Sequence, residues 1–274
     1  MSISEPAASG GEVSAARPSL YVVVPVLNEA DNMRGLVGSF RGLASEFGAE
    51  YGLRFLLVDD GSSDGTAELA EDLSDGLGLV VLRHDVNLGP GRAFATAFEY
   101  LSSRLGDDDC VVTMEGDNTS RLELLRQMTV RSREGYDVVF ASPYMYGGGV
   151  QNTSAFRVFL SHMSNAFVKE FLGIHGILTM SSFFRFYRAP ALRKLQSQYG
   201  PGIVERAGFE SMVEMTLKMI YLNIPISEVP MVLDTSQRAG KSKMKVMRTI
   251  FGYLTLWAHK NRWRPDAGSG GALG

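Results

Sequence analysis

The stretch LLVDDGSSDGT, residues 56–66, ends an apolar run with two aspartates, two glycines and a third aspartate. A buried strand that stops at Val58 would bring Asp59 and Asp60 to the rim of a sheet, where a ligand can reach them without burying an uncompensated charge. Open α/β sheets bind ligands at this rim, outside the carboxyl ends of parallel strands. The stretch therefore predicts an α/β fold with a polar site at one edge of its sheet.

Apolar runs of strand length alternate with segments of helical period on both sides of this stretch. The pattern predicts strands at 20–26, 53–58, 79–82, 110–114 and 137–141, and helices at 30–47, 66–73, 93–105 and 122–133. This order calls for a mostly parallel sheet with helices on both faces. Because the chain has no internal repeat and no Pro/Ser-rich linker, we expect one continuous domain.

The pattern changes after the glycines at 147–149. An amphipathic stretch at 156–172 is followed by an extended run at 183–187, a helical segment at 208–222 and a strand at 226–233. Residues 235–265 contain eight Lys or Arg and no Asp or Glu. Apolar residues at helical spacing predict an amphipathic helix within this basic segment: Met247, Ile250, Phe251, Leu254 and Trp257.

The composition bounds the class of protein. With 45% hydrophobic and 21% charged residues, the 274-residue chain is typical of a soluble globular protein, and its net charge of −3 argues against general nucleic-acid binding. Its single cysteine, Cys110, lies in an apolar run and indicates a reducing compartment. The first 19 residues do not have the pattern of a signal peptide. We expect a cytoplasmic protein, or one held peripherally on the cytoplasmic face of a membrane.

Polar residues follow three of the predicted strands. In a parallel sheet five carboxylates would converge on one crevice: Glu29, Asp59, Asp60, Glu115 and Asp117. Such a cluster repels itself unless a cation or a donor-rich ligand is bound. Glu115 and Asp117 point the same way in an extended segment, which suits Mg²⁺ or Mn²⁺ bound together with substrate phosphates. A solvated acidic turn is the alternative, and Asp60 could instead hold a ribose or a base edge.

Two other polar segments have more than one interpretation. Asp64 is expected to cap the following helix. The basic string at 238–244 has the charge to fold over a diphosphate, although a solvated loop or a membrane-facing patch would have the same composition. The four histidines have no metal-ligand spacing, which favours structural or surface roles for them.

Taken together, these motifs resemble family 2 glycosyltransferases, and most closely their dolichol-phosphate mannose synthase and polyprenyl-phosphate glycosyltransferase branch. The stretches that carry the resemblance span residues 20–247 and include VVVPVLNEADNM, FLLVDDGSSDGTAELA, VVTMEGDNTS, GFESMVEM and EVPMVLDTSQRAGKSKM. The resemblance implies a GT-A fold, a Rossmann-like α/β domain, at 20–234. A disordered lead-in at 1–19, a basic donor loop with an amphipathic helix at 235–264 and a disordered tail at 265–274 complete the predicted organisation.

The resemblance also implies site residues. The positions that match nucleotide-sugar contacts are Pro25, Leu27, Glu29, Val58, Asp60, Glu115, Gly116, Asp117, Arg238 and Lys243. Glu115, Asp117 and Thr119 match a Mg²⁺ or Mn²⁺ site, and Arg157 and Ser161 match acceptor-phosphate contacts. The chain departs from the family at Glu115, which replaces an aspartate, and on the acceptor side, where Pro143 and Phe183 replace an arginine and a glycine.

The implied reaction is a metal-dependent, inverting transfer from a GDP- or UDP-sugar, with Asp117 and Arg238 acting on the departing nucleoside diphosphate. A polyprenyl phosphate acceptor on the cytoplasmic membrane face would need no general base. A soluble hydroxyl acceptor would need one, for which Glu210 and Glu214 are the candidates. The alternative from another class is a catalytically silent nucleotide-sugar binding protein. The pattern does not predict the sugar, the base or the oligomeric state.

Overall fold

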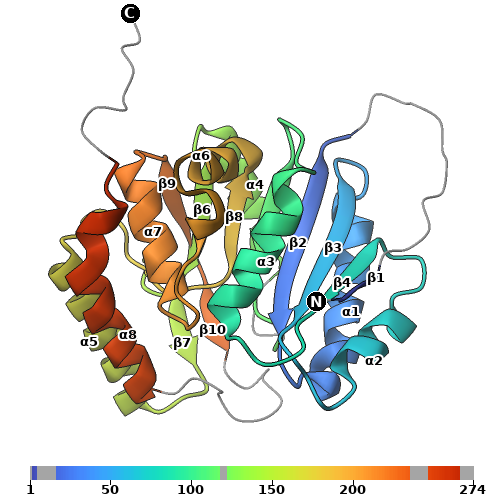
Figure 1. Cartoon of the computed structure of the whole chain (residues 1–274), viewed down its shortest axis with the longest axis horizontal. Helices are drawn as coiled ribbons and strands as arrows, with labels where there is room; N and C mark the ends of the chain where they lie inside the picture. The colour runs from blue at the N-terminus through green and yellow to red at the C-terminus, as the bar shows by residue number, and fades with distance from the viewer. Residues whose placement is uncertain (1, 5–16, 118–121, 235–245, 266–274) are drawn as a thin grey trace, which may run out of the picture.

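An eight-stranded sheet forms the centre of the molecule (Figure 1). The computed structural model describes residues 2–4, 17–117, 122–234 and 246–265. The strand order is β1-β4-β3-β2-β5-β8-β6-β9. The bounds are β1 (Ser2–Ser4), β2 (Ser19–Val26), β3 (Gly52–Asp59), β4 (Leu79–Arg83), β5 (Cys110–Thr113), β6 (Val138–Ser142), β8 (Arg185–Arg188) and β9 (Ile226–Pro230). A separate parallel pair joins β7 (Gly149–Gln151) to β10 (Val232–Asp234).

Helices cover both faces of this sheet (Figure 1). One face packs against α1 (Ala30–Phe47), α2 (Thr66–Leu73) and α4 (Leu124–Arg133). The other packs against α3 (Pro90–Ser102), α5 (Ala155–Leu172), α6 (Ala189–Tyr199), α7 (Ser211–Tyr221), α8 (Val246–His259) and the 3₁₀ turns η1 (Gly200–Ile203) and η3 (Lys260–Trp263). Side chains of β2 alternate between the two cores, since Val22 and Val24 belong to the first and Val23 to the second.

The sheet is mostly parallel, as the alternation of strands and helices predicts. The neighbouring strands β4, β3, β2 and β5 run parallel, as do β6 and β9, whereas β8 runs antiparallel to both β5 and β6. Burial on both faces explains why these strands are nearly continuous apolar runs in the sequence. The prediction of an α/β fold with a mostly parallel central sheet flanked by helices is therefore confirmed.

Two sequence expectations are wrong in detail, and one helix is missing from the prediction. Ser2–Ser4 pairs antiparallel with β4, so this part of the lead-in is ordered, and it covers what would otherwise be an exposed sheet edge. The predicted strand at 226–233 divides into β9 and β10, which belong to different sheets. Helix α6 is absent from the prediction. Residues 5–16 and 266–274, where disorder was predicted, lie outside the described residues.

No helix in the described ranges combines the length and hydropathy needed to cross a bilayer.

Candidate functional site

The carboxyl ends of β3, β2 and β5 lie side by side at one edge of the sheet. Val26 pairs with Asp59 across β2 and β3, and Val23 pairs with Thr113 across β2 and β5. The chain leaves β2, β3 and β5 in the same direction, so the polar residues that follow these strands share one rim. Because one strand separates β3 from β5, their ends are about 10 Å apart. The loop that follows β2 lies between these two strand ends.

The loops that follow β2 and β3 are hydrogen-bonded into one unit. The N–H of Asn28 donates to Oγ of Ser62 (2.8 Å), and the side-chain oxygen of Asn28 accepts from the N–H of Ser63 (2.9 Å). The N–H of Glu29 donates to Oγ1 of Thr66 (2.8 Å). Asn28 itself adopts a left-handed backbone with φ of 50°, a conformation that asparagine tolerates better than most residues. The rim is therefore fixed before any ligand binds.

Asp64 satisfies backbone donors of two helices. Its Oδ1 accepts from the N–H of Thr66 (3.1 Å), the first residue of α2, and its Oδ2 accepts from the N–H of Ala30 (3.1 Å), the first residue of α1. Burial opposes the charge of Asp64, but hydrogen bonds from Thr66 and Ala30 lower the pKa of its carboxyl below the usual value. The predicted capping role is thus shared between α1 and α2, although the N-cap residue of α2 is Gly65.

Asp60 is 3% exposed and binds the loop that leads into α3. Its Oδ1 accepts from Nδ1 of His84 (2.7 Å) and the N–H of Leu88 (2.9 Å), and its Oδ2 accepts from the N–H of Gly89 (2.7 Å). Nε2 of His84 contacts Oγ1 of Thr96 at 2.9 Å. Three of the four acceptor positions of Asp60 are thus used within the protein, so this nearly enclosed carboxylate fixes the loop at the rim.

The segment after β5 supplies the metal-type carboxylates. Gly116 is buried, and a Cβ atom there would come within 2.7 Å of Cγ1 of Val26 and 3.1 Å of the carbonyl oxygen of Pro25. Only glycine fits this close approach to β2. Glu115 and Asp117, the residues on either side of Gly116 in the sequence, are both partly exposed.

The donor set of this segment fits a hard divalent cation. Among the described residues no group of three or more His, Cys, Asp or Glu could hold a metal ion by itself. Mg²⁺ needs no such group, because it is commonly bound by one or two carboxylates together with substrate phosphates. The pair Glu115 and Asp117 therefore fits the predicted Mg²⁺ or Mn²⁺ site. Thr119, the third predicted ligand, lies outside the described residues.

A fully buried arginine, Arg185, lies on β8 and pairs with Thr113 at the end of β5. The guanidinium of Arg185 donates to the carbonyl oxygens of Ser182 (2.7 Å), Met180 (2.9 Å) and Met212 (3.1 Å). Burial lowers the pKa of Arg185, while the charge of Glu115 is among the influences that raise it. The arginine thus ties β8 to α7 and contributes positive potential near Glu115.

The remaining predicted donor contacts fall into two groups. Pro25, Leu27 and Glu29 are partly exposed at the rim, where a nucleotide can reach them. Val58 is fully buried and packs in the core, so its predicted contact with the base can come only from its backbone. Arg238 and Lys243 lie outside the described residues.

The predicted acceptor residues lie on α5. Oγ of Ser161 is 2.6 Å from the hydroxyl oxygen of Tyr144, and the ring of His162 contacts the same tyrosine edge-on at 4.9 Å. Burial raises the pKa of the Tyr144 hydroxyl. Arg157 belongs to the same helix, but the position of its side chain is outside the described part of the structure. Ser161 is therefore joined to Tyr144, which follows Pro143, one of the positions where the chain departs from the family.

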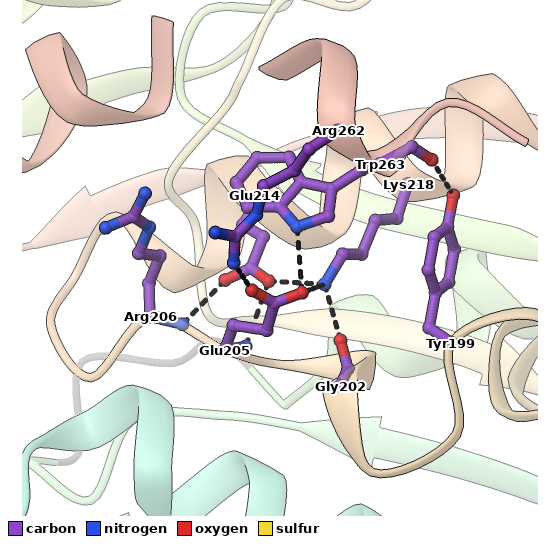
Figure 2. Close-up of polar contacts among 8 residues, drawn as sticks. All are labelled: Tyr199, Gly202, Glu205, Arg206, Glu214, Lys218, Arg262 and Trp263. Carbon is purple, nitrogen blue, oxygen red and sulfur yellow. Dashed lines mark hydrogen bonds and ion pairs between the residues drawn. The ribbon is translucent and has the colours of Figure 1, made fainter. Parts of the chain in front are cut away.

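The two candidate bases have different surroundings. Glu210 is the N-cap residue of α7, is partly exposed and lies against α8, where a Cβ atom on Gly252 would come within 2.8 Å of its carboxyl carbon. Glu214 is completely buried, pairs with Lys218, and accepts from the N–H groups of Glu205 (2.9 Å) and Arg206 (2.8 Å) (Figure 2). This arrangement contradicts the expectation that Glu214 is a general base, because substrate cannot reach its carboxylate.

Comparison with protein families matches residues 21–196 to the glycosyl transferase family 2. The chain belongs to this family. The matched segment holds well over half of the 274 residues and includes all three strand ends of the rim.

Among curated proteins, this family 2 glycosyltransferase is 28% identical to a polyprenol monophosphomannose synthase of Mycolicibacterium smegmatis over 86% of this chain and 85% of the relative. It is 26% identical to an undecaprenyl-phosphate mannosyltransferase of Micrococcus luteus over 89% of this chain and 96% of that one. Among solved structures, a glucosyl-3-phosphoglycerate synthase of Mycobacterium tuberculosis, in complex with Mn²⁺, UDP and glucosyl-3-phosphoglycerate, superposes with a TM-score of 0.58 at 18% identity. That match covers 92% of this chain and 82% of the other. It supports the GT-A fold of the glycosyltransferase.

Sequence patterns did not predict every residue that shapes the rim of this glycosyltransferase. His84 was expected to be structural or on the surface, and it is structural, but its contact with Asp60 was not foreseen. The role of Lys218 as the partner of Glu214 was also missed, although a four-residue spacing on a helix permits such pairs. The glycines at 89 and 91 were a usable signal, since closely spaced glycines often mark a close backbone approach.

Proposed function

We propose that this family 2 glycosyltransferase carries out a metal-dependent, inverting transfer of a sugar from a GDP- or UDP-sugar to a polyprenyl phosphate. The observation that carries the proposal is the rim itself. The ends of β3 and β5 place Asp60 and the pair Glu115 and Asp117 on either side of the loop after β2, at the edge of the sheet where α/β folds bind ligands.

On the donor side, Glu115 and Asp117 would hold Mg²⁺ or Mn²⁺ together with the diphosphate. A divalent ion in this position neutralises charge on a departing nucleoside diphosphate. The solved relative from Mycobacterium tuberculosis contains Mn²⁺ and UDP, which supports a divalent cation in this fold. We expect Thr119, Arg238 and Lys243 to contribute further contacts, as the family pattern implies.

On the acceptor side, a phosphate oxygen is already anionic and can attack the anomeric carbon from the face opposite the leaving group without a general base. The burial of Glu214 favours this acceptor, because it removes one of the two candidate bases and leaves Glu210. The names of both curated relatives point to polyprenol-type phosphate acceptors. A soluble hydroxyl acceptor remains the second candidate, and Glu210 would be its base.

An exposed apolar face on α5 and α8 supports a membrane-linked acceptor. The exposed large side chains on these two helices are Phe156, Phe159, Met163, Phe167 and Phe171 of α5, and Leu254 and Trp257 of α8. The rings of Phe171 and Trp257 meet edge-on at 6.0 Å, and the two helices lie side by side (Figure 1). With the basic segment at 235–265 adjoining it in sequence, this surface suits a peripheral position on the cytoplasmic face of an anionic membrane.

Replacement of Asp117 by alanine tests the proposal. We expect Asp117→Ala to lower sugar transfer from GDP-mannose or UDP-glucose to a polyprenyl phosphate at least about 100-fold in the presence of Mn²⁺, because it removes a metal ligand next to the leaving group. Asp108→Ala is the matched control, since Asp108 is an exposed carboxylate at the opposite end of β5. Donor binding without turnover by the wild-type protein would instead indicate a silent nucleotide-sugar binding protein.

A further inference from the structure

A cluster of charged and aromatic side chains joins α7 to the turns η1 and η3 (Figure 2). The ammonium group of Lys218, completely buried, contacts Glu214, the carbonyl oxygen of Gly202 and, at 3.5 Å, Glu205. The indole N–H of Trp263 donates to Oε1 of Glu205 (2.9 Å). The cluster therefore packs against residues 204–208, here called the 204–208 loop, which form the first part of the connection between η1 and α7.

Glu214 fixes the backbone of this loop directly. Its two carboxylate oxygens accept from the consecutive N–H groups of Glu205 and Arg206, and Lys218 supplies the opposite charge. Burial raises the pKa of Glu214, and the charge and hydrogen bonds of Lys218 act against that rise. A buried carboxylate with a cation and two N–H donors is fully satisfied, so loss of any one partner would loosen the loop.

The 204–208 loop also contacts the start of α3. The N–H of Gly91 donates to the carbonyl oxygen of Ala207 (2.8 Å). A Cβ atom on Gly89 would be 2.4 Å from the same oxygen, and one on Gly91 would be 1.9 Å from the carbonyl oxygen of Arg206. Both glycines are therefore required by the close approach of two backbones, which joins the start of α3 to the 204–208 loop.

The start of α3 is also the segment that Asp60 holds at the rim. The N–H groups of Leu88 and Gly89 donate to Asp60, so residues 88–91 lie between Asp60 on one side and the 204–208 loop on the other. We propose that Glu214 is a positioning residue for the donor site: through the 204–208 loop it sets the start of α3 and, with it, the orientation of Asp60. This inference deepens the proposed function and rests on it where a nucleotide is concerned.

Hydrogen exchange of the ligand-free protein tests the mechanical part. Glu214→Gln keeps the size of the side chain but loses the ion pair and one of the two acceptors for the loop N–H groups. We expect amide exchange to accelerate at least about threefold in peptides that contain residues 205–207 and in peptides that contain residues 88–91, since mutations along a packed network modulate coupling between its ends by such factors. Acceleration restricted to 205–207 and α7 would overturn the proposal.

Thr216→Val is the matched control. Thr216 is a buried residue of the same helix whose hydroxyl donates to the carbonyl oxygen of Met212 (2.8 Å), so its hydrogen bond stays within α7. A merely destabilised α7 would behave alike in both variants. We expect residues 88–91 to exchange at the wild-type rate in Thr216→Val. Gly91→Ala disturbs the contact between α3 and the 204–208 loop from the α3 side, so we expect it to accelerate amide exchange in residues 205–207.

Nucleotide binding then separates this inference from the proposed function. With Mn²⁺ present, we expect Glu214→Gln to weaken binding of GDP or UDP about fivefold to tenfold at a temperature where the variant is fully folded, while Thr216→Val binds as the wild type does. Unchanged affinity in Glu214→Gln, with wild-type binding intact, would overturn the link to the donor site. If the wild-type protein bound neither nucleotide, the proposed function would fail, whereas the exchange result would still decide whether Glu214 positions residues 88–91.

Discussion

Acidic side chains acquire different roles in this protein because of their immediate neighbours. Asp60 and Glu214 are both buried and bound to consecutive backbone N–H groups, so they hold loops in place. Glu115 and Asp117 are partly exposed at a strand end, on either side of a buried glycine that packs closely against β2. The residue type supplies the charge, but burial and the number of internal donors determine whether that charge is available to a ligand.

The contribution of a carboxylate that binds backbone N–H groups can be measured at Asp64. Asp64→Ala removes the acceptor for the N–H groups of Ala30 and Thr66, so we expect the free energy of unfolding to fall by about 1 kcal/mol at pH 7. The pKa of Asp64 is lowered in the folded state, so its contribution is present above the pKa of the unfolded chain and is lost as the pH falls through the folded value.

Urea unfolding of the wild type and Asp64→Ala at several pH values between 7 and 3 checks this prediction. The difference between the two proteins should be largest near neutral pH and should shrink at the acid end, provided that both remain folded there. A difference that is constant across the range would show that the charge of Asp64 is irrelevant to its two hydrogen bonds.

Individual elements could be predicted where a local pattern decides them. The bounds of α1 and α2 agree with the predicted 30–47 and 66–73, because their apolar spacing and flanking turns are local signals. Helix α6 was missed, since its polar sequence APALRKLQSQY buries only a few residues. The antiparallel direction of β8 could not be predicted, because pairing direction depends on which distant strands meet.

The candidate site shows the same difference between local sequence signals and contacts between distant segments. Polar residues follow each of these strands within a few positions, so the rim could be predicted from the sequence. The contact of Gly91 with Ala207 and the bonds of Glu214 to the 204–208 loop join segments that the sequence does not connect. Residue spacing therefore indicated that Glu210 and Glu214 share a helix, but it could not indicate that one is enclosed and the other is not.

Helix α1 offers a test at the element scale. Gly38 and Gly42 are exposed, neither has a positive φ, and a Cβ atom at either position would meet no atom within 4 Å. Because glycine costs about 0.5–1 kcal/mol relative to alanine inside a helix, the double variant Gly38→Ala and Gly42→Ala should raise the free energy of unfolding by about 1–2 kcal/mol. Activity should stay unchanged. Chemical denaturation measures the gain, and a loss of stability would show that α1 needs these glycines for another reason.

At the scale of the whole molecule, the surface of α5 and α8 belongs to the same side of the sheet as α3 and α7. Leu256 of α8 is fully buried in that core while Trp257 and Leu254 point away from it, so the amphipathic helix both packs on the domain and presents an apolar face. The residue of α8 that packs on the core and the residues on its exposed apolar face are therefore different.

The apolar face of α5 gives the sharpest test of a membrane-linked acceptor. Phe159 and Phe167 are 58% and 48% exposed, and burial of each in a bilayer interface would contribute about 2 kcal/mol. We expect the wild type to sediment with vesicles that contain anionic lipid, and Phe159→Glu with Phe167→Glu to reduce this binding at least about 100-fold. The double variant should still bind nucleotide with Mn²⁺, because neither residue belongs to the rim.

Gln127→Glu with Val130→Glu is the matched control, since both residues are exposed on α4, across the sheet from α5. This control adds the same charge away from the proposed membrane face, so it should sediment as the wild type does. Added salt should weaken the wild-type interaction, because the basic segment contributes through screened charges. Equal sedimentation of both double variants would show that the α5 face does not contact the membrane, and would favour a soluble acceptor with Glu210 as its base.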